Sequence, residues 1–180
     1  NEIHPGQEPR IHFHPGARFS YSGEGFHYLQ RAIERITGER IDVVFQRMIF
    51  APLRMESASF LWQAAYEQSK AYGHNAGGMA MERVRPAEVR LSWLHLTSID
   101  YANFLLAAMN EVRTGRGPTN LMLSPQVPID ESCVFCLQSA GEPRSRSLAW
   151  GLGWGLEHVG TRTAIWHWGE NRGEFQHFVM

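Results

Sequence analysis

The sequence predicts an α+β fold in which helices come first and antiparallel strands come last. Apolar residues recur at helical spacing over residues 24–37 and again over 97–112. In the last part of the chain, aromatic and aliphatic runs interrupted by glycine replace this periodicity, which is typical of strands. Because no repeat, low-complexity tract or long linker is present, we expect a single unit over residues 1–180. Its helical part should cover about 20–125 and its sheet strands about 148–180.

The first helix is expected over residues 24–37, with one apolar face made by Phe26, Leu29, Ile33 and Ile36. Gly38 follows directly and is well placed to end the helix in a left-handed conformation. Asp42 can cap a second helix, which Pro52 should stop within a turn.

Residues 57–90 are irregular and contain several glycines and a proline, so we expect a long surface excursion with at most short strands. The segment Thr97-Ser98-Ile99-Asp100 then has the form of a capping box. The helix that it begins should end at Gly115.

The run LAWGLGWGL at residues 148–156 suits one strand over which another backbone passes closely, because its glycines carry no side chain. Residues 161–168 and 175–180 are predicted as further strands, joined by a tight segment at 169–173. The tryptophans at 150, 154, 166 and 168 could line a groove, but a packed core is the favoured interpretation. Trp168 is the best candidate for exposure in a groove.

Composition excludes some classes of function. The chain has 17 Lys plus Arg and 18 Asp plus Glu, so its formal net charge is -1. This charge gives no long-range electrostatic field that would attract nucleic acid or anionic lipid. No apolar run approaches the roughly 20 residues of a membrane span. Asn1 is not Met, so we expect that the gene begins further upstream, and the cellular compartment stays open.

The sequence contains no convincing metal or cofactor site. Cys133 and Cys136 form a C-x-x-C pair without a second ligand pair, and we interpret them as ordinary thiols. His12 and His14 alternate along the chain, but neither a carboxylate nor a third histidine lies at ligand spacing nearby. They are therefore interpreted as surface residues.

Several segments together resemble the β-lactamase-related serine hydrolases, which include class C β-lactamases and penicillin-binding-protein-like esterases. The segment PGARFSYSGEG at 15–25 resembles the stretch that brings the catalytic tyrosine of this family to the start of a helix. Further similar landmarks follow in order, namely FAPLRM at 50–55, the helix over 97–109, the WGLGW strand and HWG at 167–169. The resemblance covers nearly the whole chain and implies a β-lactamase/transpeptidase-like fold.

The resemblance implies acyl transfer through a serine ester, with an ester or amide of small size as substrate and no cofactor. Tyr21 matches the catalytic tyrosine, and His167 begins an H-x-G variant of the family's K-T-G motif. The remaining implied substrate-binding or oxyanion residues are Gly23, Trp168, Gly169 and Glu170, the last through its backbone N–H. Glu24 could touch substrate or could favour the positive end of the first helix.

Two departures from the family pattern shape the expected function. The family tyrosine is usually followed two residues later by Asn, and Gly23 at this position favours an esterase-like hydrolase over a true β-lactamase. No serine is followed three residues later by lysine, so the S-x-x-K nucleophile is expected upstream of Asn1. The alternative is a non-catalytic relative that keeps the fold for binding. Neither substrate identity nor oligomeric state follows from these residues.

Overall fold

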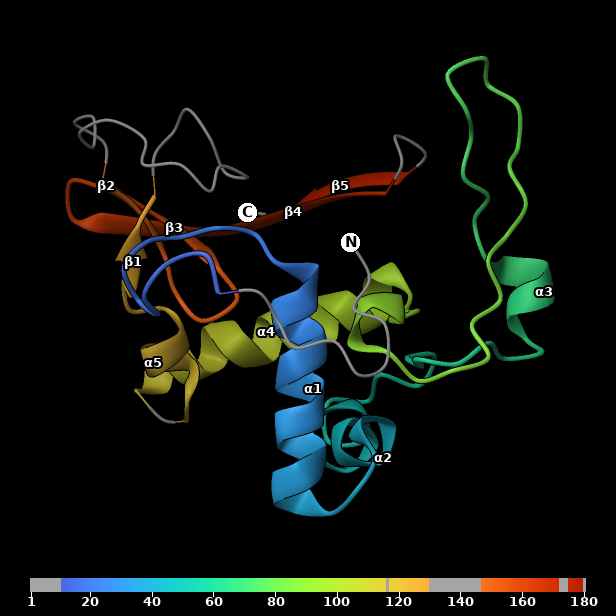
Figure 1. Ribbon diagram of the computed structural model, residues 1–180, viewed down its shortest axis with the longest axis horizontal. Coiled ribbons are helices and arrows are strands. Elements are labelled where there is room, and N and C mark those ends of the chain that lie inside the picture. Colours follow the sequence, from blue (N-terminus) through green and yellow to red (C-terminus); the bar gives the residue numbers. More distant parts are fainter. Residues whose placement is uncertain (1–10, 116, 130–146, 172–174, 180) are drawn as a thin grey trace. The chain divides into compact units, whose positions relative to one another are not determined.

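The computed structural model describes residues 11–115, 117–129, 147–171 and 175–179 (Figure 1). Contacts between residues divide the chain into two compact units. The helical unit holds Ser22–Gly73 and Met81–Asn110, and the sheet unit holds Arg10–Tyr21, His74–Ala80 and Glu111–Met180. The expected combination of helices and an antiparallel sheet is confirmed, and the fold class is α+β.

The helical unit begins with α1 (Gly23–Thr37), as the periodicity predicted. Ser22 caps the helix, since its Oγ accepts a hydrogen bond from the Gly25 N–H at 3.0 Å. Gly38 ends it with φ 70°, in the left-handed region that glycine adopts without strain.

The second helix differs in detail from the prediction. α2 (Ile41–Phe45) passes into a π-helical turn, η1 (Gln46–Phe50), and the helix stops around Pro52. Asp42 is not the cap, because the N-cap position belongs to Arg40. The carboxylate of Asp42 instead accepts a hydrogen bond from Arg40 Nε at 3.0 Å. The prediction placed the cap two residues too late.

Residues 57–90 form the expected irregular excursion. The described elements here are the short helix α3 (Tyr66–Ser69) and isolated bridges, followed by η2 (Leu91–Trp93). The start of this segment is not all at the surface, however, because Phe60 is 1% exposed. It packs with Phe50 and Met55 in the core of the helical unit.

α4 (Ser98–Thr114) confirms the predicted capping box. The Asp100 N–H donates to Thr97 Oγ1 at 3.2 Å, and the Thr97 N–H donates to the Asp100 carboxylate at 3.4 Å. Asp100 is 4% exposed and also accepts hydrogen bonds from the backbone and hydroxyl of Ser57. Gly115 follows the helix with φ 64°.

The sheet unit contains α5 (Thr119–Met122) and, within the described residues, one antiparallel sheet in the order β1-β2-β3-β4-β5. Its strands are β1 (Val127–Pro128), β2 (Ser147–Trp150), β3 (Gly155–Val159), β4 (Arg162–Asn171) and β5 (Phe175–Val179). β4 is the longest strand, and it pairs with β3 along its first half and with β5 along its second half (Figure 1).

Two strand predictions require correction. Residues 148–156 do not form one strand, because the chain turns between Trp150 and Gly155 and returns as β3. Gly153 has φ 85° in this turn, a conformation that few other residues adopt. Residues 169–171, predicted as part of a tight connection, instead continue β4 and pair with β5.

The glycines at the two ends of this turn do allow the predicted close approach. A side-chain carbon at Gly151 would overlap the carbonyl oxygen of Met122, which accepts a hydrogen bond from the Leu152 N–H at 2.8 Å. A side-chain carbon at Gly155 would overlap the indole ring of Trp166. Among the described residues of the sheet unit, the buried apolar side chains are those of Ile129, Ala149, Trp154, Leu156 and Trp166.

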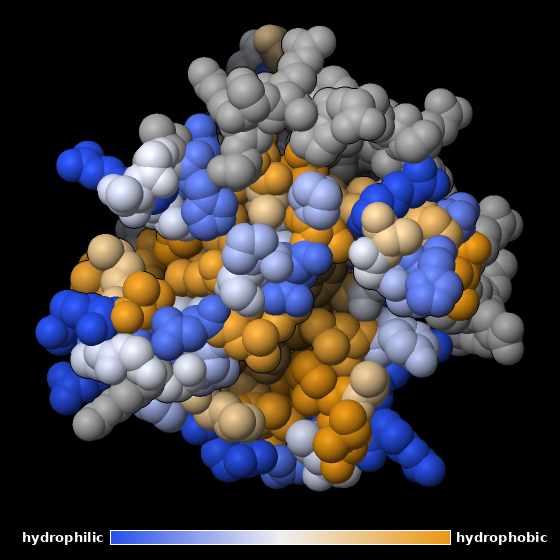
Figure 2. Space-filling model, turned by 90° about the vertical axis from the view of Figure 1, so that its left-hand side faces the viewer, coloured by the Kyte–Doolittle hydropathy of each residue, from blue (hydrophilic) through white to orange (hydrophobic). Residues whose placement is uncertain are grey.

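Both units also carry large hydrophobic side chains on their surfaces. On α1 no residue is buried, and Phe26, Leu29 and Ile36 of the predicted apolar face are between 46% and 84% exposed. Figure 2 shows apolar patches open to the viewer between polar side chains. The amphipathic pattern of α1 therefore predicted the helix correctly, but its face is not buried within the described residues.

Candidate active site

The turn at Tyr21 sits between an extended segment and α1. Ser22 has an extended backbone, with φ -145° and ψ 106°, and its side chain caps the helix. Tyr21, the residue before the cap, is 55% exposed. Gly23 begins the helix, and a side-chain carbon added there would meet no atom within 4 Å. A methyl group would therefore be tolerated at position 23.

Within the sheet unit, an aromatic cluster links the segment before Tyr21 to β4. The ring of Phe19 packs on Trp150 of β2, with 4.5 Å between centroids. Trp150 in turn contacts the imidazole of His167 and the indole of Trp166 edge-on, each at 5.5 Å between centroids. Because Phe19 lies two residues before Tyr21, this cluster ties the Tyr21 segment to the strand that carries His167.

The hydrogen-bond pattern of the sheet determines which backbone groups of β4 face which neighbour. The Gly151 N–H donates to the Trp154 carbonyl at 2.8 Å, so these two residues form a hydrogen-bonded pair across the turn. In antiparallel strands such pairs alternate with pairs that are not hydrogen-bonded. The next pair, Trp150↔Gly155, is therefore not hydrogen-bonded, so the N–H and C=O of Gly155 point toward β4. Gly155↔Trp166 is then a hydrogen-bonded pair, and the N–H and C=O of Trp166 face β3.

The same alternation continues past the end of β3. The β3–β4 ladder ends at the pair Gly155↔Trp166, while β4 continues to Asn171. The backbone groups of His167 and Gly169 therefore face β5, with which both residues are paired. The N–H and C=O of Glu170 point to the opposite edge of β4, at a position where β4 is no longer paired with β3.

The side chains of this part of β4 differ in exposure. His167, Trp168 and Gly169 are each half-buried, whereas Trp154 is 4% and Trp166 is 9% exposed. The packed-core interpretation of the tryptophans is thus confirmed at positions 154 and 166. Trp150 is half-buried and serves as the hub of the aromatic cluster.

Neither Phe19 nor Trp150 is among the site residues predicted from the sequence. The available signal was the alternation of an extended segment, which places Phe19 and Tyr21 on the same face. The partner of Phe19 could not be found in this way, because position 150 is distant in sequence. Glu24 lies in the first turn of α1, near the positive end of the helix, and is half-buried.

The described residues offer no group of three or more His, Cys, Asp or Glu side chains that could hold a metal ion. His12 and His14 are both exposed. Cys133 and Cys136 lie outside the described residues. The part of the chain that the structure describes also contains no helix that is both long and apolar enough to cross a bilayer.

Comparison with known proteins provides a family assignment. A protein-family model described as Beta-lactamase matches residues 6–180. The match thus includes both the Tyr21 turn and β4. No curated protein matches the chain.

Proposed function

Because the chain belongs to the β-lactamase family, we propose that it is part of a serine hydrolase that cleaves an ester or amide through an acyl-enzyme. In this proposal Tyr21 accepts the proton of the serine hydroxyl, and His167 is a polar neighbour of the reacting groups. The Glu170 N–H is one donor to the oxyanion, and the N–H of the serine itself is the other. The nucleophile comes from an S-x-x-K segment outside these 180 residues.

The observation that carries this proposal is the contact of one ring, Trp150, with both Phe19 and His167. It supports a common site for the Tyr21 turn and β4, two segments far apart in sequence. The strand alternation adds support for the oxyanion donor, because the Glu170 N–H faces away from β5. A backbone donor on a rigid strand needs no reorganisation when the oxyanion forms.

The chemistry assigned to Tyr21 sets a requirement on its surroundings. A phenol with an ordinary pKa of about 10 acts as a base near neutrality only when cationic neighbours favour the phenolate. The lysine of the S-x-x-K segment would supply such a cation. Serine then attacks the substrate carbonyl, and water later releases the acyl group.

The substrate class follows from position 23. Asn is the usual family residue here and binds a substrate amide, whereas this chain has Gly23 beside open space. The lack of an amide-binding side chain favours esters over β-lactams. We therefore propose an esterase-like hydrolase rather than a true β-lactamase.

The test uses the full-length protein with a fluorogenic short-chain ester and a chromogenic cephalosporin. Tyr21→Phe should lower kcat on the ester by about 100-fold or more, as expected for loss of a general base. Tyr28→Phe is the matched control, because Tyr28 is 59% exposed on α1 and has no assigned role. Ester turnover by Tyr21→Phe within twofold of the wild type would exclude the role given to Tyr21.

A simpler observation separates catalysis from the alternative of a binding protein. The gene upstream of Asn1 is expected to encode S-x-x-K about 80–120 residues before Tyr21, a spacing that the family resemblance suggests. If the motif is missing, the remaining proposal is a non-catalytic relative that keeps the fold for binding.

A further inference from the structure

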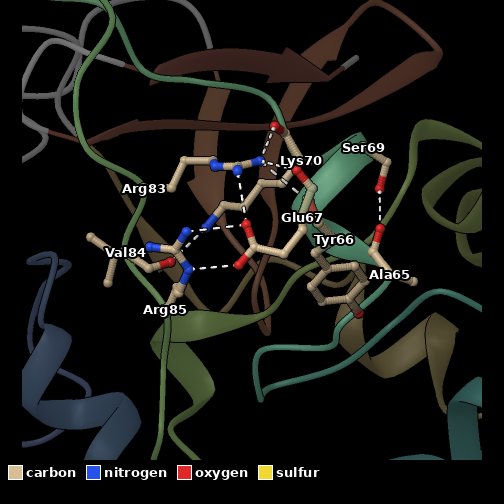
Figure 3. A network of polar contacts seen from close by, with 8 residues as sticks. All are labelled: Ala65, Tyr66, Glu67, Ser69, Lys70, Arg83, Val84 and Arg85. Atoms are coloured by element: carbon tan, nitrogen blue, oxygen red, sulfur yellow. Dashed lines mark hydrogen bonds and ion pairs between the residues drawn. The ribbon is translucent and has the colours of Figure 1, made fainter.

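Lys70 is the only lysine in the sequence, and the structure places its amine in an unusual setting. It follows α3 in the helical unit. Its Nζ lies 3.0 Å from the Val84 carbonyl oxygen and 2.8 Å from Nε2 of His95. Figure 3 shows Lys70 together with Val84 and the arginines that flank it. Of the two partners of the amine, the carbonyl oxygen of Val84 can only accept a hydrogen bond.

The imidazole of His95 is held in one orientation. Its Nδ1 lies 2.9 Å from the carbonyl oxygen of Trp93, and a carbonyl can only accept, so Nδ1 carries the proton. Nε2 therefore presents a lone pair to Lys70. The ring of Tyr66 stacks on the imidazole at an interplanar angle of 13°. His95 is thus a positioned proton acceptor for the Lys70 amine.

Positive charge surrounds this amine. Lys70, Arg83 and Arg85 all lie over the ring of Trp62, at 5.1, 5.7 and 5.1 Å from its centroid. The carboxylate of Glu67 is engaged by both arginines, at 3.0 Å from Arg83 and 2.8 Å from Arg85 (Figure 3). Among the described residues, no ion pair joins Lys70 to a carboxylate. The positive charges beside Lys70 are those of Arg83 and Arg85, and the carboxylates that act on Arg85 are those of Glu67 and Glu82.

This setting raises the fraction of the amine that is in the neutral, nucleophilic form. Burial lowers the pKa of Lys70, and the charges of Arg83 and Arg85 lower it further. A neutral amine has two N–H donors, which match the two acceptors, Val84 and His95. The third position on the nitrogen then holds the lone pair. Lysines desolvated next to other cations commonly form Schiff bases.

We propose that Lys70 is a modification site whose amine condenses with an aldehyde that carries a phosphate or carboxylate group. The anionic group would bind at Arg85, whose side chain is 46% exposed, whereas that of Arg83 is 8% exposed and donates through Nη1 to three carbonyl oxygens. The exposed guanidinium of Arg85 would select an anionic aldehyde over a neutral one.

The reaction balances without an oxidant or a reductant. The nitrogen lone pair of Lys70 attacks the aldehyde carbon, and the C–N bond forms as the C=O π bond breaks. His95 Nε2 accepts one proton from the nitrogen and passes it to the carbonyl oxygen, which gives a carbinolamine. The second proton of the nitrogen follows by the same route to the hydroxyl group, which leaves as water as the C=N bond forms. The product is an imine, and His95 is neutral again.

The test exposes the 180-residue chain to pyridoxal 5′-phosphate, reduces the imine with borohydride, and maps the adduct by mass spectrometry. Besides the α-amino group, Lys70 is the one amine that can react. The comparison is an unfolded, acetylated peptide of residues 64–76. At pH 7.5 the folded chain should react at Lys70 at least about threefold faster, since the lowered pKa gives more neutral amine than in the unfolded peptide. Equal or slower reaction of the folded chain overturns the proposal.

The anion requirement is tested with pyridoxal, which lacks the phosphate. The folded chain should prefer pyridoxal 5′-phosphate over pyridoxal by about fivefold or more, and Arg85→Gln should remove this preference. Arg47→Gln is the control, because Arg47 forms an exposed ion pair with Glu39 elsewhere in the same unit. Equal rates with both aldehydes in the wild type contradict anion recognition, and this comparison needs no variant.

The role of His95 is tested with His95→Gln, which retains an acceptor for Lys70 but not a base. The rate at Lys70 should fall by about tenfold, while binding of the phosphate, measured by competition with inorganic phosphate, should stay unchanged. An unchanged rate in this variant would show that His95 takes no part in proton transfer.

Discussion

The indole of Trp150 lies edge-on to the imidazole of His167, with 5.5 Å between the ring centroids. The other contacts of Trp150 are with Phe19 and Trp166, so one side chain joins three segments of the sheet unit. The proposed site therefore depends on a residue with no chemical role of its own. In the proposed site, Trp150 is a positioning residue for His167 and, through Phe19, for the segment that leads to Tyr21.

Replacing Trp150 should affect both stability and site geometry. Trp150→Leu is expected to lower the free energy of unfolding by about 2–4 kcal/mol, because the ring contacts with Phe19, Trp166 and His167 are lost. Trp150→Phe should lower it by less, since an aromatic ring is kept. Urea unfolding provides the measurement. Equal losses in the two variants would mean that the aromatic contacts contribute nothing beyond burial.

Gly151 and Gly23 form a matched pair for testing close backbone approach. Gly151→Ala should destabilise the protein by about 1–3 kcal/mol, because the new methyl group would overlap the Met122 carbonyl oxygen. Gly23→Ala places its methyl group in open space at the start of a helix, and it should be neutral or stabilise by up to about 1 kcal/mol. Thermal unfolding of both variants distinguishes the two cases. A neutral Gly151→Ala would argue against the close packing of α5 and β2.

Two neighbouring arginines should differ strongly in their contribution to stability. Arg83 is 8% exposed at its side chain and donates hydrogen bonds to the carbonyl oxygens of Tyr66, Glu67 and Lys70 around α3. Arg83→Leu should therefore cost about 1–3 kcal/mol, because these carbonyl oxygens, two of them part-buried, lose their donor.

The control for this prediction is Arg85→Leu. Arg85 is 46% exposed and pairs with Glu67 at the surface, so its loss should cost less than about 1 kcal/mol. Both values come from urea unfolding at neutral pH. Similar costs at the two positions would contradict the structural role assigned to Arg83.

The neutral state of His95 predicts a pH dependence of stability. Burial lowers the pKa of His95, and the charge of Lys70 lowers it further. Between this lowered pKa and the unfolded value of about 6.5, the unfolded chain binds more protons than the folded one. Stability should therefore be fully present above about pH 6.5 and decrease as the pH falls.

The measurement for this prediction compares urea unfolding of the wild type and of His95→Gln between pH 5 and 7.5. The variant should show a smaller decrease in stability below pH 6.5, because it cannot take up the proton that penalises the wild type. Parallel pH profiles would show that His95 titrates alike in the folded and unfolded chain.

Local patterns in the sequence predicted the elements that depend on neighbours in the chain. The periodicity and capping residues of α1 and α4 identified both helices, since hydrogen bonds within a helix join residues three or four apart. The strand pattern of residues 161–168 identified most of β4 for a similar reason. The Tyr21 turn and HWG motif likewise pointed to the family that the comparison shows.

Only the tertiary structure decided how distant residues meet. Residues 148–156 have the composition of a single strand, yet they turn at Gly153, and Gly155 after the turn lies against the ring of Trp166. The contact between Trp150 and His167 and the direction of the Glu170 N–H both depend on strand register. Register is set by pairing between segments far apart in the chain, and local periodicity carries no information about it.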